Sequence, residues 1–203
     1  MTDTVYVRGY EAPPVDRGEI LRYAGARGDA QEVSVLLEEC LAEIRDKLIY
    51  RVCYREFSVT EMGDTLDLGF MKTDSAALRK NLFGCDRIVL MAATVGLEID
   101  RLIARYAVVS PTKALLLQAI GAERIESLCN RFCLDLKQEK GEQGRTVRPR
   151  FSAGYGDLPL EAQRQIFDAL DCPRRIGLSL NESLLMSPSK SVTAIIGIAN
   201  LKT

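Results

Sequence analysis

The sequence predicts an α+β protein in which helices pack around a twisted antiparallel or mixed sheet. Apolar residues recur every three or four positions over 31–49 and again over 111–138, which is the period of an amphipathic helix. Residues 87–95 (RIVLMAATV) form an almost unbroken apolar run, typical of a buried central strand. The predicted strands and helices do not alternate strictly, which disfavours a doubly wound parallel sheet.

The remaining elements of the N-terminal two thirds are predicted from local signals. Short runs of β-formers indicate strands, and a cap residue before an apolar period of three to four indicates a helix. Asp16 and either Thr73 or Asp74 are such caps, and Ser110 followed by Pro111 is typical of a helix start. We therefore expect strands within 1–12 and at 50–59, and helices at 16–23, 73–84, 97–108 and 111–138.

The C-terminal part combines one helix with short strands. Asp157 and Pro159 are typical of a helix start and predict a helix over 160–170. The residues around 187–190 (SPSK) indicate a hairpin turn between short strands, and 184–186 (LLM) is interpreted as core strand. We expect the whole chain to form a single domain over residues 1–203.

Histidine and tryptophan are both absent from the 203 residues. The lack of histidine excludes Ser-His-Asp and Cys-His nucleophile pairs, imidazole-ligated metals and an imidazole general base. The 27 Lys+Arg residues nearly balance the 28 Asp+Glu residues, so the charge gives no reason to expect a nucleic-acid partner. Any reaction that the protein supports proceeds without its own imidazole.

Targeting and cysteine patterns indicate a cytoplasmic protein without a membrane segment. The N-terminus lacks the basic-then-apolar pattern of a signal peptide, and no apolar run reaches the ~18 residues of a membrane span. The 6 cysteines include no Cys-x-x-Cys pair. Cys129 and Cys133 lie four apart on one face of a predicted helix, with no further ligands nearby. We interpret the cysteines as reduced, mostly buried apolar residues rather than as a metal site.

Residues 148–159 (RPRFSAGYGDLP) carry the most unusual combination of residue types in the chain. Arginine can bind a carboxylate through two hydrogen bonds, and glycine lets the backbone approach a ligand closely. Tyrosine adds a flat apolar face, and a following helix N-terminus favours an anion. On residue chemistry alone, the segment fits either a ligand-binding loop or a structural turn with surface arginines. It is not a dinucleotide fingerprint, because no strand clearly leads into it.

Together with the C-terminal segment, this loop resembles the activation (reactivation) domain of cobalamin-dependent methionine synthase. That family carries an Arg-x-x-x-Gly-Tyr segment, a helix, and then a Leu-Thr-Glu-Ser…Met-x-Pro…Ser-Val segment. Here Arg150 to Tyr155 precede a predicted helix, and residues 177–192 (GLSLNESLLMSPSKSV) follow in the same order. Residues 93–98 (ATVGLE) are similar to the family's strand and turn, and the resemblance spans residues 88–198.

The resemblance implies a fold of helices around a twisted antiparallel sheet, and the binding of S-adenosylmethionine. The methionyl end of that molecule is a zwitterion, which needs a cation for its carboxylate and an anion for its ammonium group. Arg150 and Glu126, our best match for a glutamate of the family's long helix, would supply them. Tyr155 carries over as a ligand contact near the methyl group or the adenine, and Ser152 and Gly154 carry over as backbone contacts.

The resemblance also implies a role in repairing a cobalt cofactor. In the family, cobalamin that has been oxidised to the inactive Co(II) state is reduced by one electron and remethylated by S-adenosylmethionine. This transfer needs proximity and orientation rather than a protein base, which agrees with the absence of histidine. We expect a free-standing reactivation subunit, because the chain has no room for substrate and cobalamin modules. Its partners would be a cobalamin-binding methionine synthase core, which holds the cobalamin, and an electron donor such as flavodoxin or ferredoxin.

Two features depart from the family's pattern. The family's N-terminal acidic ligand contact lies in an Asp-Trp-Thr-Pro segment, which has no counterpart because tryptophan is absent; Asp64 or Asp67 is the alternative. The family's proline after Gly-Tyr is replaced by Gly156, which we expect to loosen that turn.

Two other functions stay open on the sequence. The chain could be a docking module that has lost S-adenosylmethionine binding and only stabilises a corrinoid protein. Alternatively, it could be an unrelated α+β enzyme that uses Arg150, Glu126 and a thiol such as Cys129. Titration with S-adenosylmethionine separates the first of these from a reactivation subunit.

Overall fold

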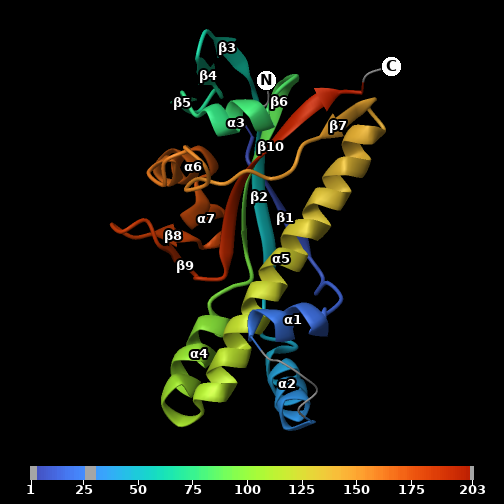
Figure 1. The fold of residues 1–203 in the computed structure, drawn as a ribbon, viewed down its shortest axis with the longest axis vertical. Coiled ribbons are helices and arrows are strands. Elements are labelled where there is room, and N and C mark those ends of the chain that lie inside the picture. The colour runs from blue at the N-terminus through green and yellow to red at the C-terminus, as the bar shows by residue number, and fades with distance from the viewer. Residues whose placement is uncertain (1–3, 26–30, 202–203) are drawn as a thin grey trace.

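The computed structural model, which describes residues 4–25 and 31–201, is built on a five-stranded sheet (Figure 1). Its strands run in the order β1 (Tyr6–Tyr10), β2 (Tyr50–Ser58), β6 (Cys85–Thr94), β10 (Ser191–Asn200) and β7 (Arg145–Val147). Every neighbouring pair is antiparallel. The predicted α+β class is confirmed, and this sheet is antiparallel rather than mixed.

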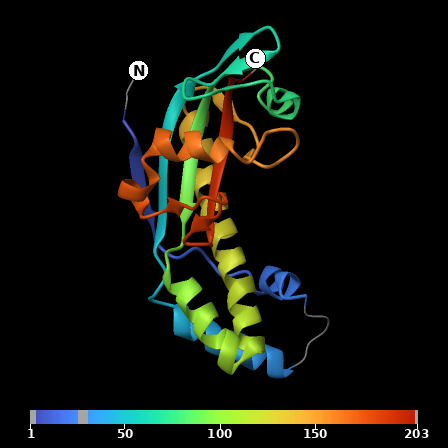
Figure 2. The same cartoon turned by 90° about the vertical axis from the view of Figure 1, so that its left-hand side faces the viewer.

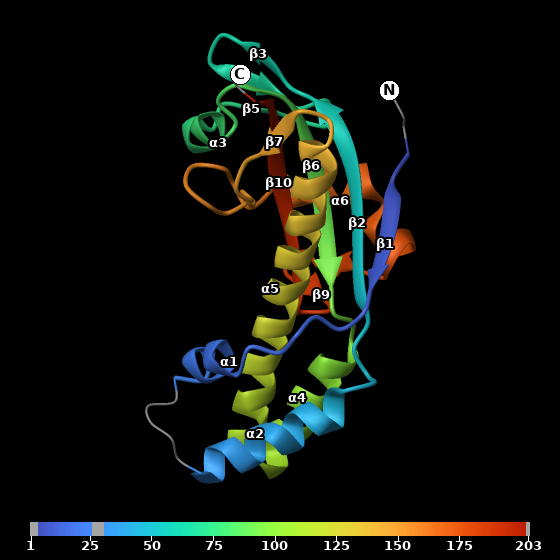
Figure 3. The same cartoon turned by 90° about the vertical axis from the view of Figure 1, so that its right-hand side faces the viewer.

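Helices cover both faces of the sheet. The long helix α5 (Pro111–Gly141) crosses one face, and α6 (Ala162–Leu170) and α7 (Cys172–Ile176) pack on the other (Figures 2 and 3). Beyond one end of the sheet, the first half of α5 meets α1 (Arg17–Tyr23), α2 (Gln31–Ile44) and α4 (Glu98–Val109). The opposite end holds α3 (Ala76–Asn81) and a small sheet of β3 (Thr60–Met62), β4 (Thr65–Asp67) and β5 (Lys72–Thr73). A hairpin of β8 (Ser179–Leu180) and β9 (Met186–Ser187) precedes β10.

Alternating side chains of β6 divide the core between the two faces of the sheet. One core cluster, on the α5 side, contains Val89, Met91 and Ala93. The other, on the α6 and α7 side, contains Ile88, Leu90 and Ala92. Since both faces are covered, the strand is a continuous apolar run in the sequence, and the predicted central strand is confirmed.

A buried ion pair holds α5 to the N-terminal segment. Glu123 and Arg124 are only 2% and 1% exposed, and the Arg124 guanidinium donates to both Glu123 carboxylate oxygens. Arg124 also donates to the Pro13 and Pro14 carbonyl oxygens, at 2.5 and 2.7 Å. Glu123 accepts from the Asp16 N–H at 3.2 Å. The pair therefore fixes the chain between β1 and α1 onto the middle of the long helix.

Two predicted helix boundaries in the first half of the chain are wrong. α2 ends at Ile44 rather than near residue 49, because the chain turns there to enter β2. The Ile49 N–H already donates to the Val95 carbonyl oxygen, 3.0 Å away. α3 begins after Ser75, whose Oγ accepts from the Leu78 N–H, so neither Thr73 nor Asp74 is the cap.

Three predictions for the C-terminal part also need correction. α6 begins at Ala162, and Asp157 does not cap it. The hairpin is formed by β8 and β9 instead. Ser187 ends β9, and residues 188–190 connect it to β10, which pairs with β6 and β7. Of residues 184–186, only Met186 belongs to a strand that packs against the core: Leu184 lies in the β8–β9 turn and Leu185 is 63% exposed. These boundaries are set by short polar turns, and the residues that contact these turns lie far away in the sequence.

Within residues 4–25 and 31–201, no helix combines the length and apolar character needed to cross a membrane.

We expect Arg124→Ala to lower the free energy of unfolding by about 3–5 kcal/mol, because it leaves the Glu123 carboxylate buried without its cation. Chemical denaturation followed by circular dichroism measures the change. Arg131→Ala is a matched control on the same helix. Arg131 pairs with Asp135 at the surface, where its side chain is 62% exposed, so the loss should stay below about 1 kcal/mol. Equal, small losses in both variants would contradict the anchoring role of Arg124.

Candidate functional site

A cavity of about 630 Å³ opens where residues 148–155 pass between α5 and β10 on their way to α6. Small-molecule sites commonly measure roughly 300–1,000 Å³, so the cavity is large enough for a metabolite. Its lining combines charged, neutral polar and apolar side chains. Four of the five residues expected at a ligand site contribute to it: Glu126, Arg150, Ser152 and Tyr155.

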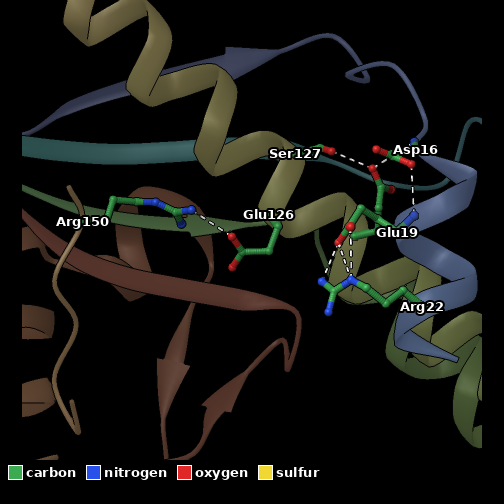
Figure 4. A network of polar contacts seen from close by, with 7 residues as sticks. Asp16, Glu19, Arg22, Glu126, Ser127 and Arg150 are labelled. Carbon is green, nitrogen blue, oxygen red and sulfur yellow. Dashed lines mark hydrogen bonds and ion pairs between the residues drawn. The ribbon is translucent and has the colours of Figure 1, made fainter. Parts of the chain in front are cut away.

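An ion pair joins the two charged residues that the sequence singled out. An Nη of Arg150 donates to the Glu126 carboxylate at 2.8 Å (Figure 4). It also donates to the Asn130 side-chain oxygen at 3.1 Å. The Arg150 side chain is 22% exposed and the Glu126 side chain is 42% exposed. The charges are therefore half-buried in the cavity wall, accessible to a ligand and weakened less by water than a surface pair.

Hydrogen bonds to β10 fix the direction of the Arg150 side chain. The Arg148 N–H donates to the Gly197 carbonyl oxygen, and Phe151 exchanges two backbone hydrogen bonds with Ile195, at 2.9 and 2.7 Å. The Ser152 Oγ then donates to the Thr193 carbonyl oxygen at 2.7 Å. Residues 148–152 thus extend the edge of the sheet beyond β7, and Arg150 reaches α5 from that edge.

The Gly-Tyr turn is closed by its own backbone. The Tyr155 N–H donates to the Ser152 carbonyl oxygen, and the Gly154 N–H donates to the Leu158 carbonyl oxygen at 2.9 Å. Gly154 has a φ of +87°, which favours glycine. It is not among the cavity-lining residues, so its expected ligand contact stays a prediction. Tyr155 stands at the cavity with 69% of its surface exposed.

The backbone at Gly156 adopts a conformation that favours glycine, and the looser turn that we expect there stays a prediction. The φ of Gly156 is +57°, a value that proline cannot adopt. A Cβ at this position would lie 2.7 Å from the Cβ of Ala77 in α3. Glycine is therefore needed here because the loop packs directly against the start of α3.

Asp157 secures the same loop to α3. Its carboxylate accepts hydrogen bonds from the Ser75 hydroxyl and from the N–H groups of Ala76 and Ala77, the latter two at 2.7 and 3.2 Å. These N–H groups belong to the first turn of the helix, where no intrahelical acceptor exists. The Asp157 carboxylate, predicted to start α6, instead completes the cap of α3.

Sequence reasoning missed three polar residues of the cavity: Asn130, Gln163 and Thr193. Asn130 lies one helical turn after Glu126, so the spacing of four could have identified it. Gln163 and Thr193 come from α6 and β10 and are joined by a 2.9 Å hydrogen bond from the Thr193 hydroxyl to the Gln163 side-chain oxygen. No local pattern links these two positions.

The structure does not bring the alternative acidic residues to the cavity. Asp64 pairs with Arg79 at 2.7 Å, and Asp67 accepts from the Gly69 N–H and lies near Lys72. Both aspartates belong to the small sheet and its turns at the end of the molecule. The proposed substitution of either one for the family's N-terminal acidic contact is therefore wrong.

Cys129 is not available as a nucleophile. It is completely buried, and this burial raises the pKa of its thiol to about 12, so it is protonated at neutral pH. Cys133 does line the cavity, but burial raises the pKa of its thiol as well. The hypothesis of an unrelated enzyme with a Cys129 nucleophile therefore has no support in the structure.

The long helix across a curled antiparallel sheet defines an α+β fold that is also found in a solved structure. That structure is the crystal structure of the MetH reactivation domain bound to AdoHcy, and the two superimpose with a TM-score of 0.67 and 16% sequence identity. The match covers 96% of this chain and 78% of that chain. No protein-family model and no curated protein sequence matches the chain. At this identity, the likeness shows the fold alone.

We expect Asp157→Asn to destabilise the protein at neutral pH and to matter less in acid. Hydrogen bonds from Ser75, Ala76 and Ala77 lower the pKa of Asp157 below its ordinary 3.8. Its charge therefore stabilises the fold above pH 3.8, and this contribution is lost as the pH falls through the lower, folded-state pKa. Denaturation of both proteins across this range measures the difference in unfolding free energy. A difference that does not change with pH would contradict the role of the Asp157 charge.

Proposed function

We propose that this chain binds S-adenosylmethionine and acts as a reactivation subunit for a separate cobalamin-dependent methionine synthase. The observation that carries the proposal is the cavity containing the Arg150–Glu126 pair, in a chain with the fold of the MetH reactivation domain. The solved domain is bound to AdoHcy, the demethylated form of S-adenosylmethionine. The resemblance in sequence points to the same ligand through the Arg150 to Tyr155 segment.

The charges of the cavity suit a zwitterionic amino-acid group. Arg150 would bind the carboxylate of the methionyl end, and Glu126 would bind its ammonium group. In the structure these two side chains satisfy each other at 2.8 Å, so a zwitterion can replace one ion pair by two. Asn130, which already contacts Arg150, would keep the guanidinium oriented during the exchange.

The rest of the cavity suits the nucleoside end of the ligand. Phe151, Met186 and Val192 contribute apolar surface to the lining. Tyr155 also lines the cavity and is exposed, and it would contact the methyl group or the adenine ring. A mixed lining with few charged groups is the usual composition of a small-molecule site.

The reactivation role needs no acid or base from this chain. When bound, S-adenosylmethionine supplies the methyl group, and the cobalamin that receives it after a one-electron reduction is held by the partner. The residues of this chain would bind and orient the ligand so that its methyl group faces the cavity opening. The protein would therefore depend on a cobalamin-binding methionine synthase core and on an electron donor such as flavodoxin or ferredoxin.

A docking module without a ligand is the second candidate function. The Arg150–Glu126 pair favours it, because the two charges neutralise each other and neither requires a ligand. Such a module would bind the corrinoid partner and stabilise one of its conformations. Ligand titration distinguishes the two candidates.

Isothermal titration should show binding of S-adenosylmethionine and S-adenosylhomocysteine to the wild type. Arg150→Ala should weaken this binding by roughly 10- to 150-fold, the equivalent of a charge-assisted hydrogen bond of ~1.5–3 kcal/mol. Arg164→Ala is the control, since Arg164 is an exposed residue of α6 that does not line the cavity. Absence of any binding to the wild type at millimolar ligand would reject the proposed function, and an unchanged affinity in Arg150→Ala would reject the role of Arg150.

Reconstitution tests the reactivation step. The wild type should restore methylated cobalamin when mixed with a cobalamin-binding methionine synthase core, S-adenosylmethionine and a reduced electron donor, as followed by visible absorption. Arg150→Ala should bind the core equally well in a pull-down but restore it more slowly at low ligand concentration. Pull-down without any ligand-dependent change in absorption would favour the docking module.

A further inference from the structure

Gln163 presents an unused hydrogen-bond donor to the cavity. It lies in the first turn of α6, is only 4% exposed, and lines the cavity. Its side-chain oxygen accepts a hydrogen bond from the Thr193 hydroxyl at 2.9 Å. Across residues 4–25 and 31–201, its Nε2 makes no hydrogen bond. The residue is almost fully buried, yet its Nε2 is not one of the fully enclosed unpaired atoms of the described residues, so a ligand atom in the cavity can accept a hydrogen bond from it.

The surrounding structure fixes the orientation of this amide. Thr193 is 1% exposed and lies near the start of β10, between Val192 and Ala194. Its hydroxyl binds the Gln163 oxygen, while its carbonyl oxygen is occupied by Ser152. The Gln163 oxygen is therefore held towards the sheet, which leaves the NH₂ group as the polar atom that faces the cavity.

The cavity thus has two separate polar groups of different character. Arg150, Glu126 and Asn130 form the charged group and are bonded to one another. Gln163 and Thr193 form the neutral group. A neutral N–H donor matches a ring nitrogen or a hydroxyl oxygen and contributes nothing to the recognition of an ammonium group. The charged group therefore suits the amino-acid half of an adenosyl amino acid, and the neutral group suits its nucleoside half.

We propose that Gln163 is a specificity-determining residue that recognises the nucleoside half of the ligand through a hydrogen bond. Its Nε2 donates to one acceptor atom of the adenine ring or of the ribose, while Thr193 holds the amide in position. The inference rests on the proposed S-adenosylmethionine site and extends it, since it assigns the selection of the nucleoside to a residue outside the family-like loop. A site with such a donor strongly disfavours the binding of an analogue that lacks the acceptor, because the donor then stays unpaired in the complex.

Two probes separate the halves of the ligand in an experiment. S-adenosylhomocysteine carries both halves, and 5′-methylthioadenosine carries the nucleoside without the charged amino-acid end. Gln163→Leu should weaken the binding of both probes by roughly tenfold or more, the effect of one lost hydrogen bond to a buried donor. Arg150→Ala should weaken the binding of S-adenosylhomocysteine alone. Thr193→Val removes the same internal hydrogen bond as Gln163→Leu but keeps the donor, so it controls for stability and should cost less affinity.

A series of analogues identifies the acceptor and separates contact from packing. The 1-deaza, 3-deaza, 7-deaza, 2′-deoxy and 3′-deoxy forms of S-adenosylhomocysteine each lack one acceptor. One of them should bind the wild type roughly tenfold more weakly, yet lose nothing further in Gln163→Leu. If Gln163→Leu lowers affinity equally for every analogue, or leaves methylthioadenosine unaffected, the inference is wrong while the site stands. If the wild type binds neither S-adenosylhomocysteine nor methylthioadenosine, the proposed function itself fails.

Discussion

The buried pair of Glu123 and Arg124 is the constraint on which the rest of the structure depends. It replaces apolar packing in the middle of α5 with two charges, and these are satisfied only when the segment between β1 and α1 lies across the helix. The pair therefore fixes the rotation of α5 about its axis. Ser127 then donates a hydrogen bond to the Glu123 carboxylate, and Glu126 turns to a different side of the helix, where it meets Arg150 (Figure 4). The geometry of the candidate site follows from this anchoring.

The parts of the fold that depend on local periodicity could be predicted from the sequence. α5 and β6 are long and strongly patterned, because each must bury a continuous apolar surface. The boundaries of α3 and α6 could not be predicted in the same way. Ser75 and Asp157 cap the same helix although 82 positions separate them, and such a contact leaves no signal in either neighbourhood. Sequence chemistry identified Asp157 as a capping residue but assigned it to the wrong helix.

The candidate site divides along similar lines. Arg150 and Glu126 were identified through a resemblance in sequence, and the structure places them in contact. Asn130 lies on the same helical face as Glu126, so the spacing of four residues could have predicted it. Gln163 and Thr193 were not, because their proximity depends on how α6 packs against β10. Short motifs and helical spacing could thus identify the residues that lie on one loop or one helix, whereas Gln163 and Thr193 required the tertiary structure.

The cap that Asp157 provides for α3 has a consequence for the energetics of binding. The loop with Tyr155 cannot move away without exposing the first N–H groups of α3 and separating Gly156 from Ala77. The loop is therefore held in one conformation before any ligand arrives. Its conformational entropy is lost when the chain folds, so a ligand that binds there does not have to order it again.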